Sequence, residues 1–181
     1  MKHVIAACEV ASVTLVFLDN AYMYGPSLAS PIDEQHAQQP VAKKGEVRKV
    51  VTGILLQAVA KRRVQAVVGR AAEFYGPQAI NSMFYINFLE RLLRGKAPQV
   101  LVKSGIKHTY AYTEDIGRAL VLLALDPSTY GSVWHLPVGQ PITIEEMTAM
   151  FSKALSTDFK ANFMPSLLRH GLSWFIPPCA K

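Results

Sequence analysis

The amino-acid sequence predicts an α/β fold in which a doubly wound parallel sheet is joined to a smaller α+β domain. Three observations predict it: two short β-branched runs, an amphipathic helical stretch between them, and mixed helix and strand patterns later in the chain. Apolar runs without polar alternation are typical of strands buried on both faces of a parallel sheet. A strand, a helix and a second parallel strand form a right-handed unit, the building block of such sheets.

The N-terminal part of the chain holds this unit. Strands are predicted over residues 13–18 and 64–68, and residues 46–63 place apolar side chains at helical spacing between them. The segment 19–44 is far longer than an ordinary strand-to-helix loop, and it contains three prolines. Open α/β sheets bind ligands beyond the carboxyl ends of their strands, so we expect a functional site in this segment.

The pattern changes after residue 76, and we place a domain boundary there. A helix is predicted over 79–94 with Gly95 as its terminating glycine, followed by a strand over 108–112 and a helix with Thr113 as N-cap. A strand is predicted over 133–136. Thr143 and Glu146 have the spacing of a capping box, which predicts a helix from residue 144.

Composition excludes several classes of protein. With 181 residues, 50% hydrophobic and 18% charged, the chain is too apolar for disorder and long enough to bury a core without metal or disulfides. The apolar stretch 4–18 is too short to cross a membrane and contains Glu9. The same stretch faintly resembles a signal peptide, but it lacks a small-residue cleavage segment. Two distant cysteines without a C-x-x-C pair favour a reducing cytoplasm.

The net charge of +6 raises the question of nucleic-acid binding. The basic cluster 61–63 lies at the predicted end of a helix, where cations complement the helix dipole, and no aromatic residues are interleaved with it. We therefore expect no nucleic-acid partner. The five histidines are scattered, so no metal site is expected either.

Five segments, in order along nearly the whole chain, carry a family pattern. They are VFLDNAYMYGP (16–26), KKGEVR (43–48), GRAAEFYGP (69–77), YAYTEDIGRAL (110–120) and GSVWHLP (131–137). Together they resemble the NAD-dependent epimerase/dehydratase family, the extended short-chain dehydrogenase/reductases. The resemblance implies reversible hydride transfer with NAD or NADP on a small-molecule substrate, often a nucleotide sugar. Residues 1–76 would then form the C-terminal half of a Rossmann-like domain, and residues 77–181 a mixed α/β substrate-binding region, the two interleaving in space.

The sequence departs from the family at its phosphate-binding loop. The family opens with G-x-x-G-x-x-G after its first strand, and no such spacing exists here. Residues 1–11 instead look like the end of a later helix. We therefore expect a fragment or truncated product of a longer enzyme. The resemblance also implies a homodimer formed through the helix 46–63.

A second departure concerns the family's Tyr-x-x-x-Lys pair, because none of the seven tyrosines has a lysine four residues later. By resemblance, Lys44 and Arg48 fall at the Tyr and Lys positions, and Asn20 falls where a Ser or Thr usually lies. In one interpretation these three residues form an altered catalytic site, in which Asn20 binds the substrate and the cations stabilise an oxyanion. In the other, Asn20 satisfies backbone groups at the strand end and the two cations are solvated.

Further site residues are assigned near the strand ends. The resemblance implies cofactor contacts from Asp19, Ala71 and Glu73. Substrate contacts are expected from Tyr22, Tyr24, Phe74 and Tyr75. Glu73 stands where the family often has Asn, and an acid there would repel a substrate phosphate.

Three functional hypotheses follow. The first is a fragment of an NAD(P)-dependent epimerase, dehydratase or reductase acting on a sugar-like or other hydroxyl-bearing substrate. The second is a non-catalytic module of the same fold that binds a dinucleotide or a partner protein. The third is a truncated product without a function of its own.

Overall fold

The computed structural model describes residues 1–25, 31–100 and 103–163. The chain divides into two units. Unit 1 comprises Met1–Ala72 and Glu114–Pro137, and unit 2 comprises Glu73–Thr113 and Val138–Lys181. The chain thus leaves unit 1 after Ala72 and returns to it from Glu114 to Pro137.

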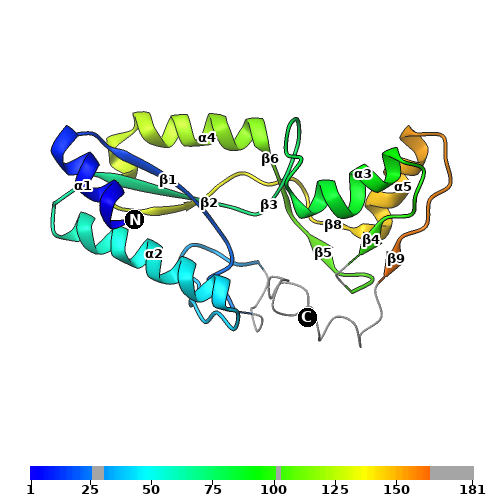
Figure 1. Ribbon diagram of the computed structural model, residues 1–181, viewed down its shortest axis with the longest axis horizontal. Coiled ribbons are helices and arrows are strands. Elements are labelled where there is room, and N and C mark those ends of the chain that lie inside the picture. Colours follow the sequence, from blue (N-terminus) through cyan, green and yellow to red (C-terminus); the bar gives the residue numbers. More distant parts are fainter. Residues whose placement is uncertain (26–30, 101–102, 164–181) are drawn as a thin grey trace. The chain divides into compact units, whose positions relative to one another are not determined.

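Unit 1 is built on a three-stranded parallel sheet with the order β1-β2-β7. Its strands are β1 (Leu15–Asn20), β2 (Ala66–Ala71) and β7 (Val133–His135). Its helices are α1 (Lys2–Ala11), α2 (Lys43–Ala60), α4 (Thr113–Leu125) and the short 3-10 turn η2 (Pro127–Thr129). Figure 1 shows α2 on one face of this sheet and α4 on the other. The predicted α/β fold with a parallel sheet is therefore confirmed.

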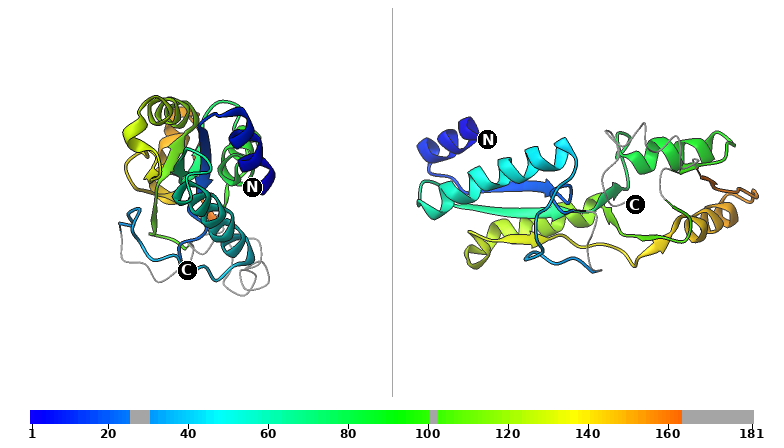
Figure 2. Two further views of the ribbon diagram at one scale, coloured as in Figure 1. Left: turned by 90° about the vertical axis from the view of Figure 1, so that its left-hand side faces the viewer. Right: turned by 90° about the horizontal axis from the view of Figure 1, so that it is seen from below.

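Alternating side chains of β2 supply the two faces of the sheet. Ala66 and Val68 pack with Ile5 of α1 and Leu55 of α2 in one apolar cluster. Gly69 faces the other way, where an added Cβ would meet Leu120 of α4 at 2.8 Å. Figure 2 shows the same layering from two further directions. The central strand is buried on both faces, as its unbroken apolar sequence predicts.

The strands and the helix of unit 1 differ in their bounds from the expected ones. β1 and β2 both end later than predicted, because they pair in register from Leu15 with Ala66 to Asn20 with Ala71. The polar residues at the end of β1 are therefore part of the sheet. α2 begins at Lys43 rather than 46 and ends at Ala60, since Arg62 adopts a left-handed φ of 56°.

Unit 2 contains three two-stranded pairings and an amphipathic helix. The parallel pairs are β3 (Glu73–Tyr75) with β6 (Tyr110–Tyr112), and β4 (Gln99–Val100) with β9 (Asn162–Phe163). The antiparallel pair is β5 (Lys107–His108) with β8 (Ile142–Thr143). The helices are η1 (Tyr85–Leu89), α3 (Glu90–Leu93) and α5 (Ile144–Ala154). The expected strand over 108–112 is thus two strands with different partners.

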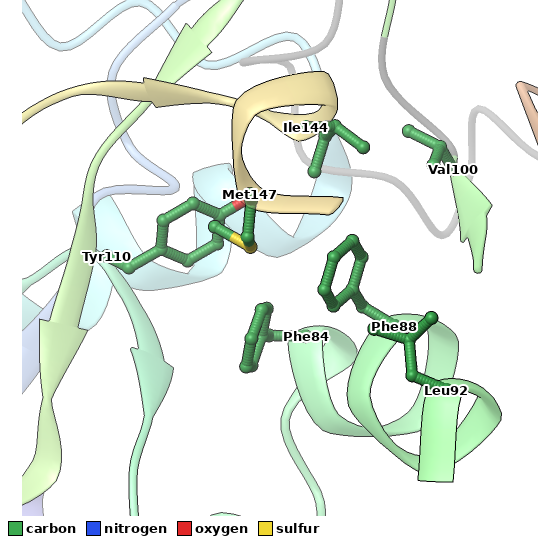
Figure 3. Packing of buried hydrophobic residues seen from close by; sticks show 7 residues of the cluster. All are labelled: Phe84, Phe88, Leu92, Val100, Tyr110, Ile144 and Met147. Carbon is green, nitrogen blue, oxygen red and sulfur yellow. The ribbon is translucent and has the colours of Figure 1, made fainter. Parts of the chain in front are cut away.

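An aromatic core holds unit 2 together. Phe84 stacks on Phe88 with ring centroids 5.3 Å apart and lies 5.5 Å from the ring of Tyr110. Figure 3 shows these three rings around Met147 of α5. Aromatic pairs at this separation contribute beyond the area they bury.

Of the local sequence signals in unit 2, two are confirmed and one helix begins later than predicted. The predicted capping box is confirmed, since the Thr143 hydroxyl accepts from Glu146 N–H and the Glu146 carboxylate accepts from Thr143 N–H. Gly95 is confirmed as the terminating glycine with a φ of +68°. Helical structure before it begins at residue 83 rather than 79, because the Ser82 hydroxyl accepts the Tyr85 N–H at 3.0 Å and starts the helix there. No helix in the described part of the chain is long and apolar enough to cross a membrane.

Candidate functional site

The carboxyl end of β1 carries a buried ion pair. Asp19 pairs in register with Arg70 of β2, and the Arg70 Nε lies 3.4 Å from Asp19 Oδ2. The Asp19 and Arg70 side chains are 0% and 1% exposed. Thr52 of α2 donates its hydroxyl to the same carboxylate oxygen at 2.7 Å. Buried charges need such partners, so the pair fixes α2 and both strands at this point.

Arg70 extends the network from Asp19 toward β7. Its Nη1 donates to the Tyr24 hydroxyl at 2.8 Å, and that hydroxyl lies 2.7 Å from Nε2 of His135. The backbone N–H of His135 donates to Glu34 Oε1 at 2.7 Å. One chain of polar contacts therefore joins Asp19, Arg70, Tyr24, His135 and Glu34 across the sheet.

Three groups of this network have shifted pKa values. Burial raises the pKa of the Tyr24 phenol, although the Arg70 charge opposes the shift. Burial also lowers the pKa of His135, against the attraction of Glu34. The His135 backbone N–H lowers the pKa of Glu34, because it hydrogen-bonds the ionised carboxylate. These directions favour a neutral phenol, a neutral imidazole and a charged carboxylate.

The chain turns sharply after β1. The Asn20 side chain accepts the backbone N–H of Tyr22 at 3.0 Å, which ends the strand. β1 therefore ends at Asn20, and Tyr22 and Tyr24 do not lie on a continuation of this strand. Tyr22 is partly exposed, whereas Tyr24 is 1% exposed and turned into the network.

The first turn of α2 packs directly on this turn. A Cβ at Gly45 would lie 2.3 Å from the backbone oxygen of Tyr22, so only glycine permits the approach. Arg48, three residues on, brings its Nη1 to 4.0 Å from Asp19 Oδ1, while its side chain stays 41% exposed. Lys44 is exposed beside Gly45. The structure thus brings Asn20 and Arg48 to the end of β1, with Lys44 on the first turn of α2.

The remaining predicted residues fall on both units. Ala71 is buried at the end of β2, opposite Asn20 in register. Glu73, Phe74 and Tyr75 form β3 in unit 2, where Glu73 pairs with Tyr110 of β6. Burial raises the pKa of the Tyr110 phenol, and the Glu73 charge raises it further.

The glycines near these strand ends serve internal packing. An added Cβ at Gly25 would meet the backbone oxygen of Gln39 at 2.3 Å, and that at Gly45 would meet Tyr22. Neither leaves room for a phosphate, so these two glycines do not form the pyrophosphate cradle that a dinucleotide needs. Within the same residues, no group of His, Cys, Asp and Glu could hold a metal ion.

A hollow of about 470 Å³ lies between the long loop and α2. Polar side chains of the loop, including Glu34 and His36, line one side, and Lys49 and Thr52 of α2 line the other. The Thr52 hydroxyl already donates to Asp19, and the Lys49 ammonium uses one of its three N–H groups on the Gln38 carbonyl.

Sequence reasoning missed the polar network. Arg70 lay beyond the predicted strand 64–68 and was given no role, His135 lay in the predicted strand 133–136 without a role, and Glu34 was not singled out. One signal was present in the sequence. Arg70 closely follows an apolar run, and a buried charge at such a position needs a counter-charge; Asp19 ends the neighbouring apolar run.

The parallel sheet, with α2 on one face and α4 on the other, defines a doubly wound type of α/β fold. The family model described as NAD dependent epimerase/dehydratase family matches residues 1–136. The chain belongs to this family.

Solved structures of the same fold agree at low sequence identity. UDP-N-acetylglucosamine 4-epimerase from Methanobrevibacter ruminantium M1 superposes with a TM-score of 0.77 at 20% identity, over 90% of this chain and 53% of that one. UDP-glucose 4-epimerase from Thermotoga maritima gives a TM-score of 0.78 at 19% identity, over 89% and 53%. The dTDP-glucose 4,6-dehydratase DesIV from Streptomyces venezuelae, solved with NAD, gives 0.75 at 17% identity, over 89% and 51%. The chain spans about half the length of these proteins. A search of curated proteins found no match.

Proposed function

We propose that this chain is the substrate-facing part of an NAD(P)-dependent oxidoreductase that transfers hydride to and from a hydroxyl-bearing, sugar-like substrate. One observation carries the proposal: in a chain of this family, Asn20 and Arg48 lie at the carboxyl end of β1, with Lys44 on the first turn of α2. The sugar-like substrate is supported by relatives of the same fold, whose names are those of nucleotide-sugar enzymes. The cofactor would be held mainly by residues other than those described.

A nicotinamide cofactor, when bound, would supply the hydride transfer, and the residues of this chain would bind the substrate hydroxyl. The Asn20 amide would hydrogen-bond that hydroxyl, whose proton would pass to water, while Lys44 and Arg48 would stabilise the negative charge that develops on its oxygen. Tyr22, Phe74 and Tyr75 are proposed to contact the substrate. Because Tyr24 is 1% exposed, it would support the turn inside the fold and would not touch the substrate directly.

The proposed assembly is a homodimer through α2. Val47 and Val50 on this helix are 53% and 58% exposed, which supports a contact with a second copy. Sedimentation of wild-type protein and of Val47→Asp would test it, and a monomeric wild type would rule it out. A cytoplasmic location remains a prediction from the cysteine content.

A non-catalytic binding module is the second candidate. It is favoured by the missing Tyr-x-x-x-Lys pair and by the placement of Arg48 beside the buried carboxylate of Asp19, which partly neutralises its charge. Such a protein would bind a dinucleotide or a partner without chemistry. A truncated product without function is the third.

The test begins with the coding DNA upstream of Met1, read in frame for G-x-x-G-x-x-G, and continues with the protein of the whole reading frame. Sugar products from UDP-glucose and dTDP-glucose are measured directly, because a hydride that returns to the substrate leaves no net change in NAD(P)H absorbance. Transient NAD(P)H absorbance and cofactor binding are followed alongside. Asn20→Ala should lower turnover by about a hundredfold, the effect of losing one oxyanion-type donor. Asn20→Asp keeps the oxygen that accepts the Tyr22 N–H, so it separates catalysis from the turn. Lys44→Ala should also lower turnover, whereas Lys43→Ala is the matched control.

The outcomes distinguish the three hypotheses. Turnover that falls in Asn20→Ala and Asn20→Asp supports the enzyme. Cofactor binding without turnover of any nucleotide sugar supports the binding module. Neither binding nor turnover identifies a product without function.

A further inference from the structure

Donor counting fixes the protonation of the buried network. An arginine guanidinium has only donors, so the Arg70 to Tyr24 contact uses a lone pair of the phenol oxygen. Among the described residues, Nε2 of His135 at 2.7 Å is the one partner of this hydroxyl that can accept its proton, so the arrangement that satisfies the phenol has Nε2 as the acceptor. An imidazole that accepts at Nε2 is neutral and carries its proton on Nδ1.

Charged groups on several elements face this imidazole. Arg70 of β2 repels a proton on His135, while Asp33 and Glu34 of the long loop attract one. On the far side of the Tyr24 ring, His36 makes an edge contact at 6.3 Å. Burial outweighs the two carboxylates, so the pKa of His135 lies below its ordinary value.

Protonation would reverse the direction of the contact to Tyr24. Nε2 would become a donor facing the phenol oxygen, and the phenol proton would lose its acceptor inside the fold. Because Tyr24 is 1% exposed, water cannot replace that acceptor without movement of the turn. The Glu34 contact, in contrast, uses the backbone N–H of His135 and survives protonation.

We propose that His135 is a positioning residue that holds the turn after β1 in place when neutral and releases it when protonated. The turn carries Asn20 and Tyr22, so proton uptake on β7 would disorder residues that lie two strands away. As a statement about regulation of that site, the inference rests on the proposed function. Its test does not depend on turnover, so the two can fail separately.

The sign of the effect follows from linkage. The unfolded chain binds a proton at the ordinary histidine pKa, about 6.5, and the folded chain binds it only at lower pH. The stability contributed by neutral His135 is therefore complete above about pH 6.5 and is lost as pH falls toward the folded pKa.

The first measurement is the long-range proton–nitrogen NMR spectrum of His135 in the wild-type protein. It should show protonated Nδ1 and unprotonated Nε2 at neutral pH. The opposite tautomer would overturn the proposal without any variant.

The second measurement is amide hydrogen exchange from pH 8 to pH 5, corrected for intrinsic rates. The N–H groups of Tyr22 and Tyr24 bond to Asn20 Oδ1 and to the Ala21 carbonyl, and their protection should fall at least tenfold as His135 titrates. The N–H of His36, bonded to the Asp33 carbonyl, should keep its protection.

Two variants complete the test. His135→Gln keeps an acceptor near the Nε2 position but cannot be protonated in this range, so the fall in protection should vanish. His36→Gln removes the other imidazole beside Tyr24 and should leave the fall unchanged. The proposal would be refuted if amide protection fell equally in His135→Gln, or if protection in the wild type did not change with pH.

Discussion

Replacing Arg70 with Met should strongly destabilise unit 1. The substitution leaves the Asp19 carboxylate, 0% exposed, with the Thr52 hydroxyl and a partly exposed Arg48 at 4.0 Å. Breaking a buried pair by removing one partner costs about 3–5 kcal/mol. The bond from Arg70 to Tyr24 is lost as well.

The double variant Asp19→Asn with Arg70→Met should recover much of this loss. Both charges are then absent, and the Asn side chain still accepts from Thr52. Replacing both partners leaves a deficit of about 1–2 kcal/mol from lost hydrogen bonds. The double variant should therefore be about 2–3 kcal/mol more stable than Arg70→Met. With the Asp19→Asn single variant the same measurements give the coupling energy of the two positions.

Native-state hydrogen exchange of the β1 and β2 amides measures the free energy of opening this sheet. Arg63→Met is the control, because Arg63 pairs with Glu9 in an exposed contact, the two side chains being 50% and 39% exposed. That control should not alter exchange of the strand amides. A loss below 1 kcal/mol in Arg70→Met, or a double variant no more stable than the single one, would refute the argument.

Two substitutions test local packing and capping. Gly45→Ala should lower the free energy of unfolding in urea by about 1–3 kcal/mol, because its Cβ would lie 2.3 Å from the Tyr22 oxygen. Gly53→Ala, whose Cβ would meet nothing within 4 Å among the described residues, should raise it by about 0.5–1 kcal/mol. Equal effects of the two substitutions would contradict the packing argument. Thr143→Ala should destabilise α5 by about 1 kcal/mol through loss of the bond to Glu146 N–H, and Thr143→Ser should restore it, as measured by exchange of the α5 amides.

The order of elements could be predicted because each depends on neighbouring residues. The capping box at Thr143 and the glycine after α3 are local signals, and both are present. The helix before Gly95 begins later than predicted because the Ser82 hydroxyl caps its N-terminus by accepting the Tyr85 N–H. The parallel sheet followed from apolar runs that had to be buried on both faces.

The chemistry of the strand ends could not be predicted in the same way. Asp19 and Arg70 are 51 residues apart, and they meet only because β1 and β2 pair in that register. A shift of one residue between the strands would put the two side chains on opposite faces of the sheet. Tyr24 was expected to contact the substrate. The side chain of Asn20 ends β1, and Tyr24 lies inside the fold with 1% of its surface exposed.

The network also separates the roles of the two cations proposed for catalysis. The Arg48 guanidinium is partly exposed to solvent and lies 4.0 Å from Asp19 Oδ1, an oxygen that accepts no hydrogen bond from the described residues. The Asp19 carboxylate therefore partly neutralises its positive charge. Lys44 is exposed, one helical turn from Arg48. Losing Arg48 should therefore reduce both stability and turnover, whereas losing Lys44 should reduce turnover alone. Lys44 is consequently the cation whose full charge is available to a developing oxyanion, and the comparison of Lys44→Ala with Arg48→Ala in unfolding and in turnover decides which of them acts on the substrate.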